Sequence, residues 1–423
     1  MECLFKKVQI IDPNSSYNGK KCDVLVKNGI ITEINSKGIQ KAKGKELVCD
    51  GSMLSPGWVD IGAQCGEPGY EHRETLLSLA SAAAKGGYTS IGIFPNTKPI
   101  IHSKSEVQFI ASSAKNAAVA IFPIGAVSYN ADGDVMAEFL QMWESGAIAF
   151  SDGYKSIQKS SLLNRSLEYI KLIPQAIIIN SCVDEHLAKG GQAHESEWST
   201  YLGLKGIPNI AETTMTKRDI EIVKYAQSRL MIHKISCAET VQILKKEKSN
   251  LNGLFASVSA FNLAFDDSVL KDFESNFKLN PPLRDQYDRK ALIKGILDGT
   301  IDLIVSDHTP LEPEKKEVEF QNAAFGAINL ETAFAMMMSL DNLDISPQVW
   351  VEKTAIRPRE IFPIPKRTIE EGQQAELTWF HPKQPWIYES SESKSLSKNS
   401  PFFGKKFNGK VLGVLVNERL IQF

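Results

Sequence analysis

The sequence predicts an α/β protein: a (β/α)8 barrel of the TIM type with a small β-sandwich domain formed by both ends of the chain. Two observations predict this fold. Apolar runs of strand length recur through the middle of the chain, and amphipathic, helix-like stretches lie between them. Both ends instead carry short alternating runs separated by turn residues. We therefore assign residues 1–54 and 359–423 to the sandwich and residues 55–358 to the barrel.

The N-terminal segment has the pattern of a β-hairpin. The stretch CDVLVKNGIITEI (22–34) alternates apolar and polar residues around Asn28-Gly29. An Asn-Gly pair between two such runs is the strongest short hairpin signal, because a two-residue turn needs positive φ angles. The first 54 residues are therefore expected to form small β structure.

The middle of the chain contains eight apolar runs with helical patterns between them, such as ETLLSLASAAAKGG (74–87) and DRKALIKGILDG (288–299). Strands that are hydrophobic along their whole length lie in parallel sheets buried on both faces. Eight units over about 300 residues fit a (β/α)8 barrel. The long gap at 182–229 predicts an extended loop over the barrel mouth. The eight runs are 57–62, 88–94, 119–124, 147–151, 176–181, 230–236, 254–260 and 301–306.

The tail returns to the pattern of the N-terminus from about Gly372. AELTWF (375–380) and GKVLGVLV (409–416) read as short strands with turn residues between them. We expect these strands to pack with the N-terminal ones in one β-sandwich.

Composition excludes several classes of partner. The net charge of −2 offers nothing to attract nucleic acid or an anionic membrane. The six cysteines are scattered without a C-x-x-C pair, which is typical of free thiols in a reducing compartment. No apolar run has transmembrane length, and the start of the chain lacks a signal-peptide pattern. We expect a cytoplasmic protein.

Catalytic residues of such barrels lie at the carboxyl ends of the strands. Here those ends carry Gly62 and Gln64, Asn96, Asp152, Ser181, Lys234 and Asp307. Strand alternation places His233, the neighbour of Lys234, on the opposite face, outward under the helices.

Six fragments, in order along the chain, resemble the dihydroorotases of the bacterial class that pairs with aspartate carbamoyltransferase. These belong to the amidohydrolase superfamily of metal-dependent barrels. The resemblance runs from about residue 3 to the end, with the family's spacing, and implies hydrolysis of a cyclic amide in pyrimidine biosynthesis with zinc as cofactor. The fragments are SPGWVDIGAQCGEPGYEHRET, KGGYTSIGIFPNTKP, LGLKGIPNIAE, NPPLRDQYDRKALIKGILDGTIDLIVSDHTP, FGAINLETA and SKNSPFFGKKFNGKVLGVLV.

The chain departs from this family at the residues that the family uses for chemistry. Working members carry Asp-x-His-x-His-x-Arg after the first barrel strand. Here Asp60 remains, but Gly62 and Gln64 replace the two zinc-binding His, and Gly66 replaces the Arg that binds the substrate carboxylate.

The other ligand positions are altered as well. Ser181 and Lys234 stand where the family has its third and fourth zinc-binding His. Leu311 replaces a His that contacts substrate. The resemblance therefore implies that all four ligand His and two carboxylate contacts are absent.

Several family positions are retained. Asp307 matches the catalytic base, although its activity is doubtful without zinc, and Asp152 is a candidate remnant of the metal-bridging Asp-Asp-Gly motif. The substrate-side positions are matched by Asn96, Asn280, Phe325 and Gly326. The two asparagines could equally cap loops.

The energetics favour an inactive protein. Zinc lowers the pKa of bound water from 15.7 to roughly 7, which is worth on the order of 12 kcal/mol. A lone base such as Asp307 contributes about 3–5 kcal/mol. Lys234 places an ammonium where a cation would bind, so we expect no metal cofactor. We predict that the ammonium pairs with Asp307, and with Asp152 as well.

Three functions remain open. The first is an inactive structural or regulatory homologue, for which the resemblance implies aspartate carbamoyltransferase or a second copy of the chain as partner. The second is an active cyclic amidohydrolase of the dihydroorotase, hydantoinase or allantoinase type. The third is a module that binds a pyrimidine intermediate through Asn96 and Asn280 without turning it over. The losses at the ligand positions favour the first.

Overall fold

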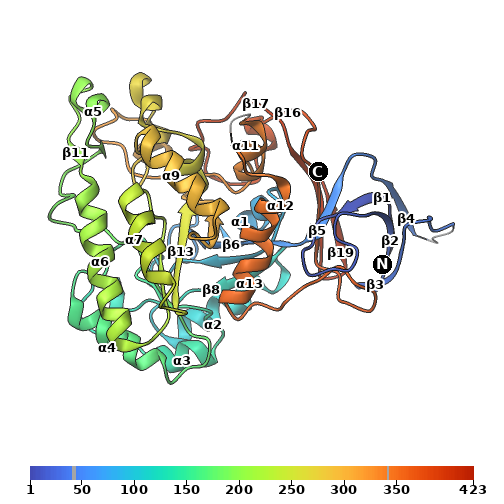
Figure 1. Ribbon diagram of the computed structural model, residues 1–423, viewed down its shortest axis with the longest axis horizontal. Coiled ribbons are helices and arrows are strands. Elements are labelled where there is room, and N and C mark those ends of the chain that lie inside the picture. The colour runs from blue at the N-terminus through green and yellow to red at the C-terminus, as the bar shows by residue number, and fades with distance from the viewer. Residues whose placement is uncertain (41–43, 341–342) are drawn as a thin grey trace.

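A parallel barrel forms the larger part of the computed structural model, which describes residues 1–40, 44–340 and 343–423 (Figure 1). One parallel sheet contains β6 (Trp58–Ala63), β7 (Tyr88–Ile93) and β8 (Ala120–Pro123). A second contains β9 (Ile178–Asn180), β12 (Leu230–Ile232), β13 (Leu254–Ser259) and β14 (Leu303–Val305).

Phe150 joins these two sheets. It forms single parallel bridges to Gly125 and Ile178, so the run predicted at 147–151 takes its place in the barrel through isolated bridges. On the other side, the amide of Ser306 donates to the Asp60 carboxylate at 2.7 Å and closes β14 against β6. The predicted (β/α)8 architecture is confirmed.

Helices cover the outside of the barrel (Figure 1). The longest are α1 (Leu76–Lys85), α2 (Lys104–Ser113), α4 (Ser160–Ile170), α6 (Asn209–Ala226), α7 (Ala238–Lys248) and α9 (Gln286–Leu297). The shorter ones are α3 (Phe139–Glu144), α5 (Glu197–Tyr201), α8 (Ala260–Ala264), α10 (Pro313–Lys316), α11 (Ala333–Ser339), α12 (Pro347–Val351) and α13 (Arg357–Ile361).

The prediction of an extended loop over 182–229 was wrong in its second half, which helix α6 occupies. This helix buries Met215, Ile220 and Val223 at helical spacing, so its stability comes from packing on the barrel. The first half holds only α5 and the short pair β10 (Ala193–His194) and β11 (Gly206–Ile207) among its regular elements.

The interior of the barrel is a separate apolar layer. Alternate residues of the strands point inward and pack together, as in other barrels of this type. The residues of α13 and the segment after it close the floor. The cluster includes Val59, Ile61, Phe94, Ile124, Ile148, Ile177, Ile179, Met231, Leu303, Val305, Ile361, Phe362 and Ile364.

The two chain ends meet in one eight-stranded sheet at the side of the barrel (Figure 1). Its order is β19-β18-β15-β5-β1-β2-β3, with β4 beside β1. Strand β15 pairs antiparallel with β5, with Trp379 opposite Leu54. The strands are β1 (Glu2–Ile10), β2 (Lys21–Lys27), β3 (Ile30–Asn35), β4 (Lys45–Val48), β5 (Met53–Pro56), β15 (Leu377–His381), β18 (Lys410–Val416) and β19 (Arg419–Gln422).

The predicted hairpin is confirmed within this sheet. Strands β2 and β3 pair antiparallel, with Lys27 opposite Ile30. Asn28 and Gly29 have φ angles of 48° and 72°, the left-handed conformations that the turn requires. A small two-stranded ribbon, β16 (Trp386–Ile387) and β17 (Lys406–Phe407), lies between the sheet and the barrel helices (Figure 1).

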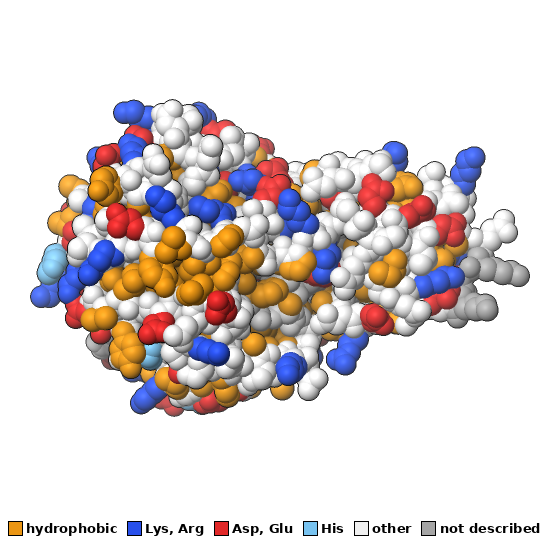
Figure 2. Space-filling view, turned by 90° about the horizontal axis from the view of Figure 1, so that it is seen from below, with side chains coloured by type: hydrophobic (Ala, Val, Ile, Leu, Met, Phe, Trp, Pro, Cys, Tyr) orange, Lys and Arg blue, Asp and Glu red, His pale blue; other side chains and the backbone are white. Residues whose placement is uncertain are grey.

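The surface differs between the two parts. Seen from below, apolar side chains gather in a patch on the barrel half, whereas the half with the terminal sheet carries scattered charged side chains (Figure 2). In the described ranges, every helix is too short or too polar to cross a bilayer.

Candidate active site at the barrel mouth

A cavity of ≈ 330 Å³ opens at the carboxyl ends of the barrel strands. Loops after β6, β12 and β14 supply most of its wall, and three of the predicted strand-end residues, Gln64, Lys234 and Asp307, line it together. The lining residues are Gln64, Arg73, Tyr154, Lys234, Asn280, Asp307, Thr309, Leu311, Lys315, Ala324, Phe325 and Gly326.

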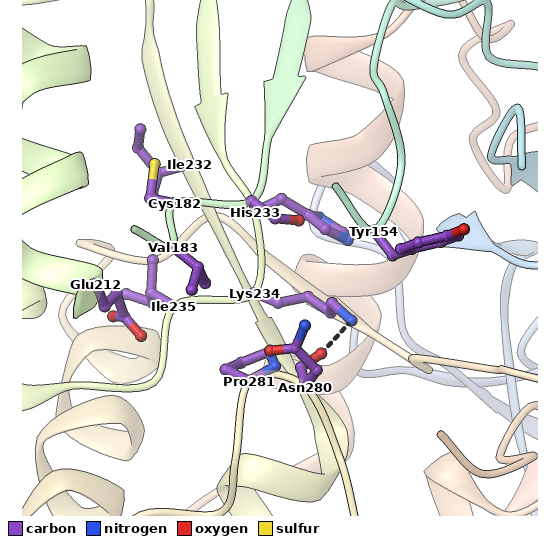
Figure 3. Close-up of a pocket in the computed structure, with 11 residues that line it drawn as sticks. Tyr154, Cys182, Val183, Glu212, Ile232, His233, Lys234, Ile235, Asn280 and Pro281 are labelled. Carbon is purple, nitrogen blue, oxygen red and sulfur yellow. Dashed lines mark hydrogen bonds between the residues drawn. The ribbon is translucent and has the colours of Figure 1, made fainter. Parts of the chain in front are cut away.

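An ion pair stands at the centre of this cavity wall. The ammonium of Lys234 lies 2.6 Å from the Asp307 carboxylate, and their side chains are only 10% and 7% exposed. The same nitrogen donates to the carbonyl of Asn280 at 2.7 Å, as Figure 3 shows. The predicted pairing of Lys234 with Asp307 is confirmed.

Both members of the pair have unusual backbones. Lys234 has φ = 54° and Asp307 has φ = 59°, in the left-handed region that L residues rarely adopt. Such conformations cost of order 1–3 kcal/mol each and persist only where the surroundings impose them. The two strand ends are therefore shaped to bring these side chains together.

Asp152 does not take part in the pair. Both of its carboxylate oxygens accept hydrogen bonds from Ser128, from the amide at 2.9 Å and from the hydroxyl at 2.7 Å. Burial raises the pKa of Asp152, and the bonds from Ser128 oppose that rise. The prediction that Asp152 also pairs with Lys234 was wrong, because Ser128 on a neighbouring loop already satisfies the carboxylate.

Gly62, at the position that the resemblance assigns to a zinc-binding His, has no room for a side chain. Gly62 has φ = +96°, and a Cβ there would lie 2.7 Å from the ring of Phe94. The Phe94 side chain thus occupies the space that a metal-binding side chain at position 62 would need. Gln64 lines the cavity with its side chain, while its amide donates to the carbonyl of His308 at 2.9 Å. The hydroxyl of Ser181 donates to the carbonyl of Gly153 at 3.4 Å.

These four positions do not fit a zinc ion. Zinc sites in proteins use thiolates, imidazoles and carboxylates. Here the corresponding side chains are a hydrogen atom, an amide, a hydroxyl and an ammonium that is already bound to the nearest carboxylate. The ammonium would repel the metal.

His233 points into the barrel, so its predicted outward orientation was wrong. Its ring lies 5.1 Å from that of the interior residue Phe94, and its Nδ1 is 2.8 Å from the hydroxyl of Ser257. Strand β12 ends at Ile232, and the left-handed turn at Lys234 ends the alternation. Both side chains therefore extend to the same side (Figure 3). Burial and the charge of Lys234 lower the pKa of His233, which favours a neutral imidazole.

A second, smaller cavity lies beside this turn, with Ser181, His233 and Lys234 in its wall (Figure 3). Its volume is ≈ 20 Å³. That is room for about one water molecule. It is therefore too small to hold a substrate.

The retained asparagines differ in what they do. The Asn96 amide donates to the carbonyl of Asp152 at 3.1 Å and accepts from the amide of Tyr154 at 3.2 Å. Asn96 therefore caps the 152–154 loop, which is the structural alternative for this residue. Asn280 lines the cavity together with Asp307, Phe325 and Gly326. The ligand-binding role of these cavity residues stays a prediction.

Sequence reasoning missed Asn399, which shapes the cavity from outside. Its side-chain oxygen accepts from the amide of Leu311 at 3.1 Å, and its nitrogen donates to the carbonyls of Thr309 at 2.9 Å and Gly326 at 3.4 Å. Arg73, Tyr154 and Lys315 were also missed. Arg73 lies in a loop and Lys315 in the four-residue helix α10, both too short for a periodic pattern, and only their nearness to Gly66 and Leu311 could have drawn attention to them.

Elsewhere, His194, Asp285 and Asp288 bring possible ligand atoms within 4.8 Å of one another. The guanidinium of Arg284 lies 3.0 Å from His194 Nδ1. A guanidinium can only donate, so Nδ1 accepts and the ring proton sits on Nε2. Neither nitrogen then offers a free lone pair. Burial and the charge of Arg284 lower the pKa of His194 to about 4.

The two carboxylates of this group also have structural partners. Asp285 accepts from the amide of Asp288 at 2.9 Å and caps α9, while Asp288 accepts from the amide of Ala238 at 2.7 Å. The group is therefore explained as a contact that joins the 193–207 segment to the helices, rather than as a cation site.

Comparisons with known proteins agree with this architecture. The family model described as "Dihydro-orotase-like" matches residues 51–240. A dihydroorotase from Syntrophus aciditrophicus is 38% identical over 100% of this chain and 99% of its own length. A dihydroorotase from Acetivibrio thermocellus is 37% identical over 99% of this chain and 98% of its own length.

Solved structures share the fold at lower identity. An L-hydantoinase (dihydropyrimidinase) from Arthrobacter aurescens superposes with a TM-score of 0.86 at 21% identity, covering 99% of this chain and 96% of that one. A D-hydantoinase gives 0.82 at 18% identity, covering 100% and 95%. Both similarities extend over the barrel and the terminal sheet together.

Proposed function

Because the chain belongs to the dihydroorotase family, we propose that it is a dihydroorotase-like protein of pyrimidine biosynthesis that no longer opens the ring and serves a structural or regulatory role. The observation that carries this proposal is the ion pair at the barrel mouth. At a position that the family gives to a zinc-binding His, the Lys234 ammonium lies 2.6 Å from Asp307, the family's base position.

The pair affects the base as well as the metal. A general base must present a lone pair to the proton that it removes. Here one oxygen of Asp307 is engaged by an ammonium. Even a free base contributes only about 3–5 kcal/mol, against on the order of 12 kcal/mol that zinc supplies by acidifying water. The residues at the mouth lack the larger of these two contributions.

The same pair explains how the fold tolerates the loss of a metal. A carboxylate that is 7% exposed and had lost its cation would be left uncompensated in a low-dielectric site. The ammonium of Lys234 compensates it. Phe94 fills the space next to Gly62 in the same way, so no void is left beside that position.

As partner we propose aspartate carbamoyltransferase or a second copy of this chain, in the cytoplasm. The apolar patch on the barrel half (Figure 2) supports a protein partner, since contiguous exposed apolar surface commonly marks an interaction site. Co-expression with the carbamoyltransferase of the same organism, followed by co-purification, tests this. Two separate peaks at micromolar concentrations would contradict the proposed pairing.

The loss of chemistry is tested by turnover. Purified protein is assayed with dihydroorotate and with N-carbamoyl-aspartate, with and without added zinc, beside an active family member as a positive control. We expect no turnover above the uncatalysed rate. Zinc-dependent turnover that a chelator abolishes would contradict the proposal.

A second function, an active cyclic amidohydrolase of the dihydroorotase, hydantoinase or allantoinase type, is favoured by one observation. The chain is 38% identical over its full length to a protein named dihydroorotase. The assay above, extended to hydantoin and allantoin, separates the two functions.

A further inference from the structure

We propose that two loops beside the barrel mouth are joined by a pH-sensitive contact, the buried amine of Lys316, and that they separate more readily as the pH falls because separation lets this amine take up a proton. The loops are residues 273–280, the first rim segment, and residues 312–326, the second rim segment. The inference goes beyond the proposed function and does not depend on whether the chain opens a ring.

The two rim segments contain little regular structure. A single 3-10 turn, Ser275–Phe277, lies in the first segment, and the four-residue helix α10 lies in the second. Turns this short have almost no stability of their own, because the cost of starting a helix is not repaid within one turn. The position of each segment therefore depends on its contacts with the other.

Lysine side chains supply most of the hydrogen bonds between the rim segments. Five such bonds join them in the described ranges, and lysine amines donate three of the five. The Nζ of Lys316 lies 2.5 Å from the carbonyl oxygen of Ser275. The Nζ of Lys278 donates to two carbonyls of the second segment, those of Phe320 at 2.7 Å and Gln321 at 2.9 Å.

Both amines are buried without an anion. Lys278 and Lys316 are each only 3% exposed. Their hydrogen-bond acceptors are backbone carbonyls, and neither amine forms an ion pair with a carboxylate of the residues that the structure describes. A buried ammonium without an anion is costly, so such a group tends to give up its proton.

The surroundings of Lys278 favour the charged form. Its Nζ lies 5.3 Å from the centre of the Phe320 ring and 5.1 Å from that of Phe325. The faces of aromatic rings attract cations. No ring lies over the Nζ of Lys316 in the part of the chain that is described. Of the two amines, Lys316 is therefore the one that loses its proton first.

The contacts of Lys316 suit a neutral amine. Its Nζ has two acceptors, the carbonyls of Ser275 at 2.5 Å and Ala324 at 2.8 Å. An amine that has lost one of its three protons still has a donor for each. Burial and the charge of Lys278 lower the pKa of Lys316 from 10.5 to about 7, and the exposed Glu274 opposes this shift. The other charged side chains of the two segments are Glu312, which pairs with Arg73, and the exposed Glu314, Lys315, Glu317 and Glu319.

Separation of the rim segments is therefore coupled to proton uptake. In the separated form the amine of Lys316 meets water and regains its ordinary pKa of 10.5, so between about pH 7 and 10.5 this form holds one proton more than the joined form. Each unit by which the pH falls in this range favours separation up to about tenfold. Below about pH 7 both forms are protonated and the dependence ends. Asn280, Phe325 and Gly326 belong to these segments and line the mouth cavity, so the pH acts on the shape of the mouth.

Amide hydrogen exchange of the full chain, measured by mass spectrometry between pH 7 and 9 and corrected for the intrinsic exchange rate, tests the proposal. We expect the protection of both rim segments to rise with pH, by up to about tenfold per unit, while that of helix α2 stays constant. Lys316→Met should remove this pH dependence. Lys271→Met, at an exposed lysine outside both segments, should keep it.

A second measurement needs no variant that might fold poorly. In the wild-type chain with 13C-labelled lysine side chains, one lysine should titrate near pH 7 by NMR. In Lys278→Met this titration should move to higher pH, because a neighbouring charge is removed. The proposal is overturned if all lysines titrate near 10.5, if the protection of the rim segments does not change with pH, if Lys316→Met keeps the dependence, or if α2 shows it equally.

Discussion

Asp60 and Gly62 both lie near the end of strand β6. Asp60 matches the pattern of the family, whereas Gly62 replaces a His of that pattern. Asp60 is fully buried and accepts from Ser306 twice, from the amide at 2.7 Å and from the hydroxyl at 2.6 Å. It thereby joins the last barrel strand to the first. Gly62 makes no such connection, and the ring of Phe94 fills the space beside it.

The same division holds around the rim. Asn96 and Asp152, the latter a candidate remnant of the metal-bridging motif, each hold a neighbouring loop through hydrogen bonds to its backbone. Gln64 and Ser181 stand at positions that the resemblance assigns to zinc ligands, and their side chains make at most one long contact with the backbone. Asp60, Asn96 and Asp152 are thus bonded within the fold itself, whereas Gly62, Gln64 and Ser181 are altered at positions that the resemblance assigns to zinc.

The largest expected effect is at the ion pair. Lys234→Met leaves the 7% exposed carboxylate of Asp307 without a cation, which should lower the free energy of unfolding by about 3–5 kcal/mol. Urea denaturation measures this. Adding Asp307→Asn removes the uncompensated charge, so the double variant should recover at least half of the loss. A single variant as stable as the wild type would show that the pair does not compensate the carboxylate.

A somewhat smaller effect on stability is expected at His194, which lies with Asp285 and Asp288 in a group of potential metal ligands away from the barrel mouth. Its pKa is lowered from 6.5 to about 4, so below pH 6.5 the unfolded chain binds a proton that the folded chain does not. Above pH 6.5 His194 is neutral in both states and does not affect the free energy of unfolding. As the pH falls from 6.5 to 4, proton binding to His194 of the unfolded chain lowers that free energy. The loss amounts to about 3 kcal/mol.

The matched variant for this effect is His194→Gln, which keeps an acceptor for Arg284. The difference in unfolding free energy between wild type and variant should shrink by that amount between pH 7 and pH 4. A chelator should leave both melting temperatures unchanged at pH 7. If a chelator lowered the melting temperature of the wild type alone, the cluster of His194, Asp285 and Asp288 would hold a cation and would not be only a structural contact.

The smallest effect compares a retained and an altered position directly. Asp60→Ala leaves the buried amide and hydroxyl of Ser306 without an acceptor, which should cost about 1–3 kcal/mol. Gln64→Ala removes a side chain that lines the cavity and should change stability by at most about 0.5 kcal/mol. Equal losses of unfolding free energy in the two variants would contradict the view that Asp60 supports the fold and Gln64 does not.

Features fixed by chain topology could be predicted from the sequence. Parallel strands bring their carboxyl ends to one rim, so Lys234 and Asp307 could be paired although they are far apart in sequence. The hairpin at Asn28-Gly29 and the pairing of the two chain ends followed from local turn chemistry and alternation.

Features set by irregular backbone could not be predicted. The left-handed turn at Lys234 reversed the expected direction of His233, since alternation holds only inside a strand. The partner of Asp152 and the cavity positions of Arg73 and Lys315 depend on how loops fold back, which leaves no periodic signal. Asn399 reaches the mouth from a segment assigned to the other domain, and local patterns carry no information about such a contact.

The most direct test of the account is the zinc content of the full chain, purified from zinc-supplemented medium and measured by elemental analysis. Because the Lys234 ammonium pairs with Asp307 where the resemblance places zinc, we expect far less than one zinc per chain and no ring opening by that preparation. About one zinc per chain, retained through dialysis and required for hydrolysis of dihydroorotate, would contradict it.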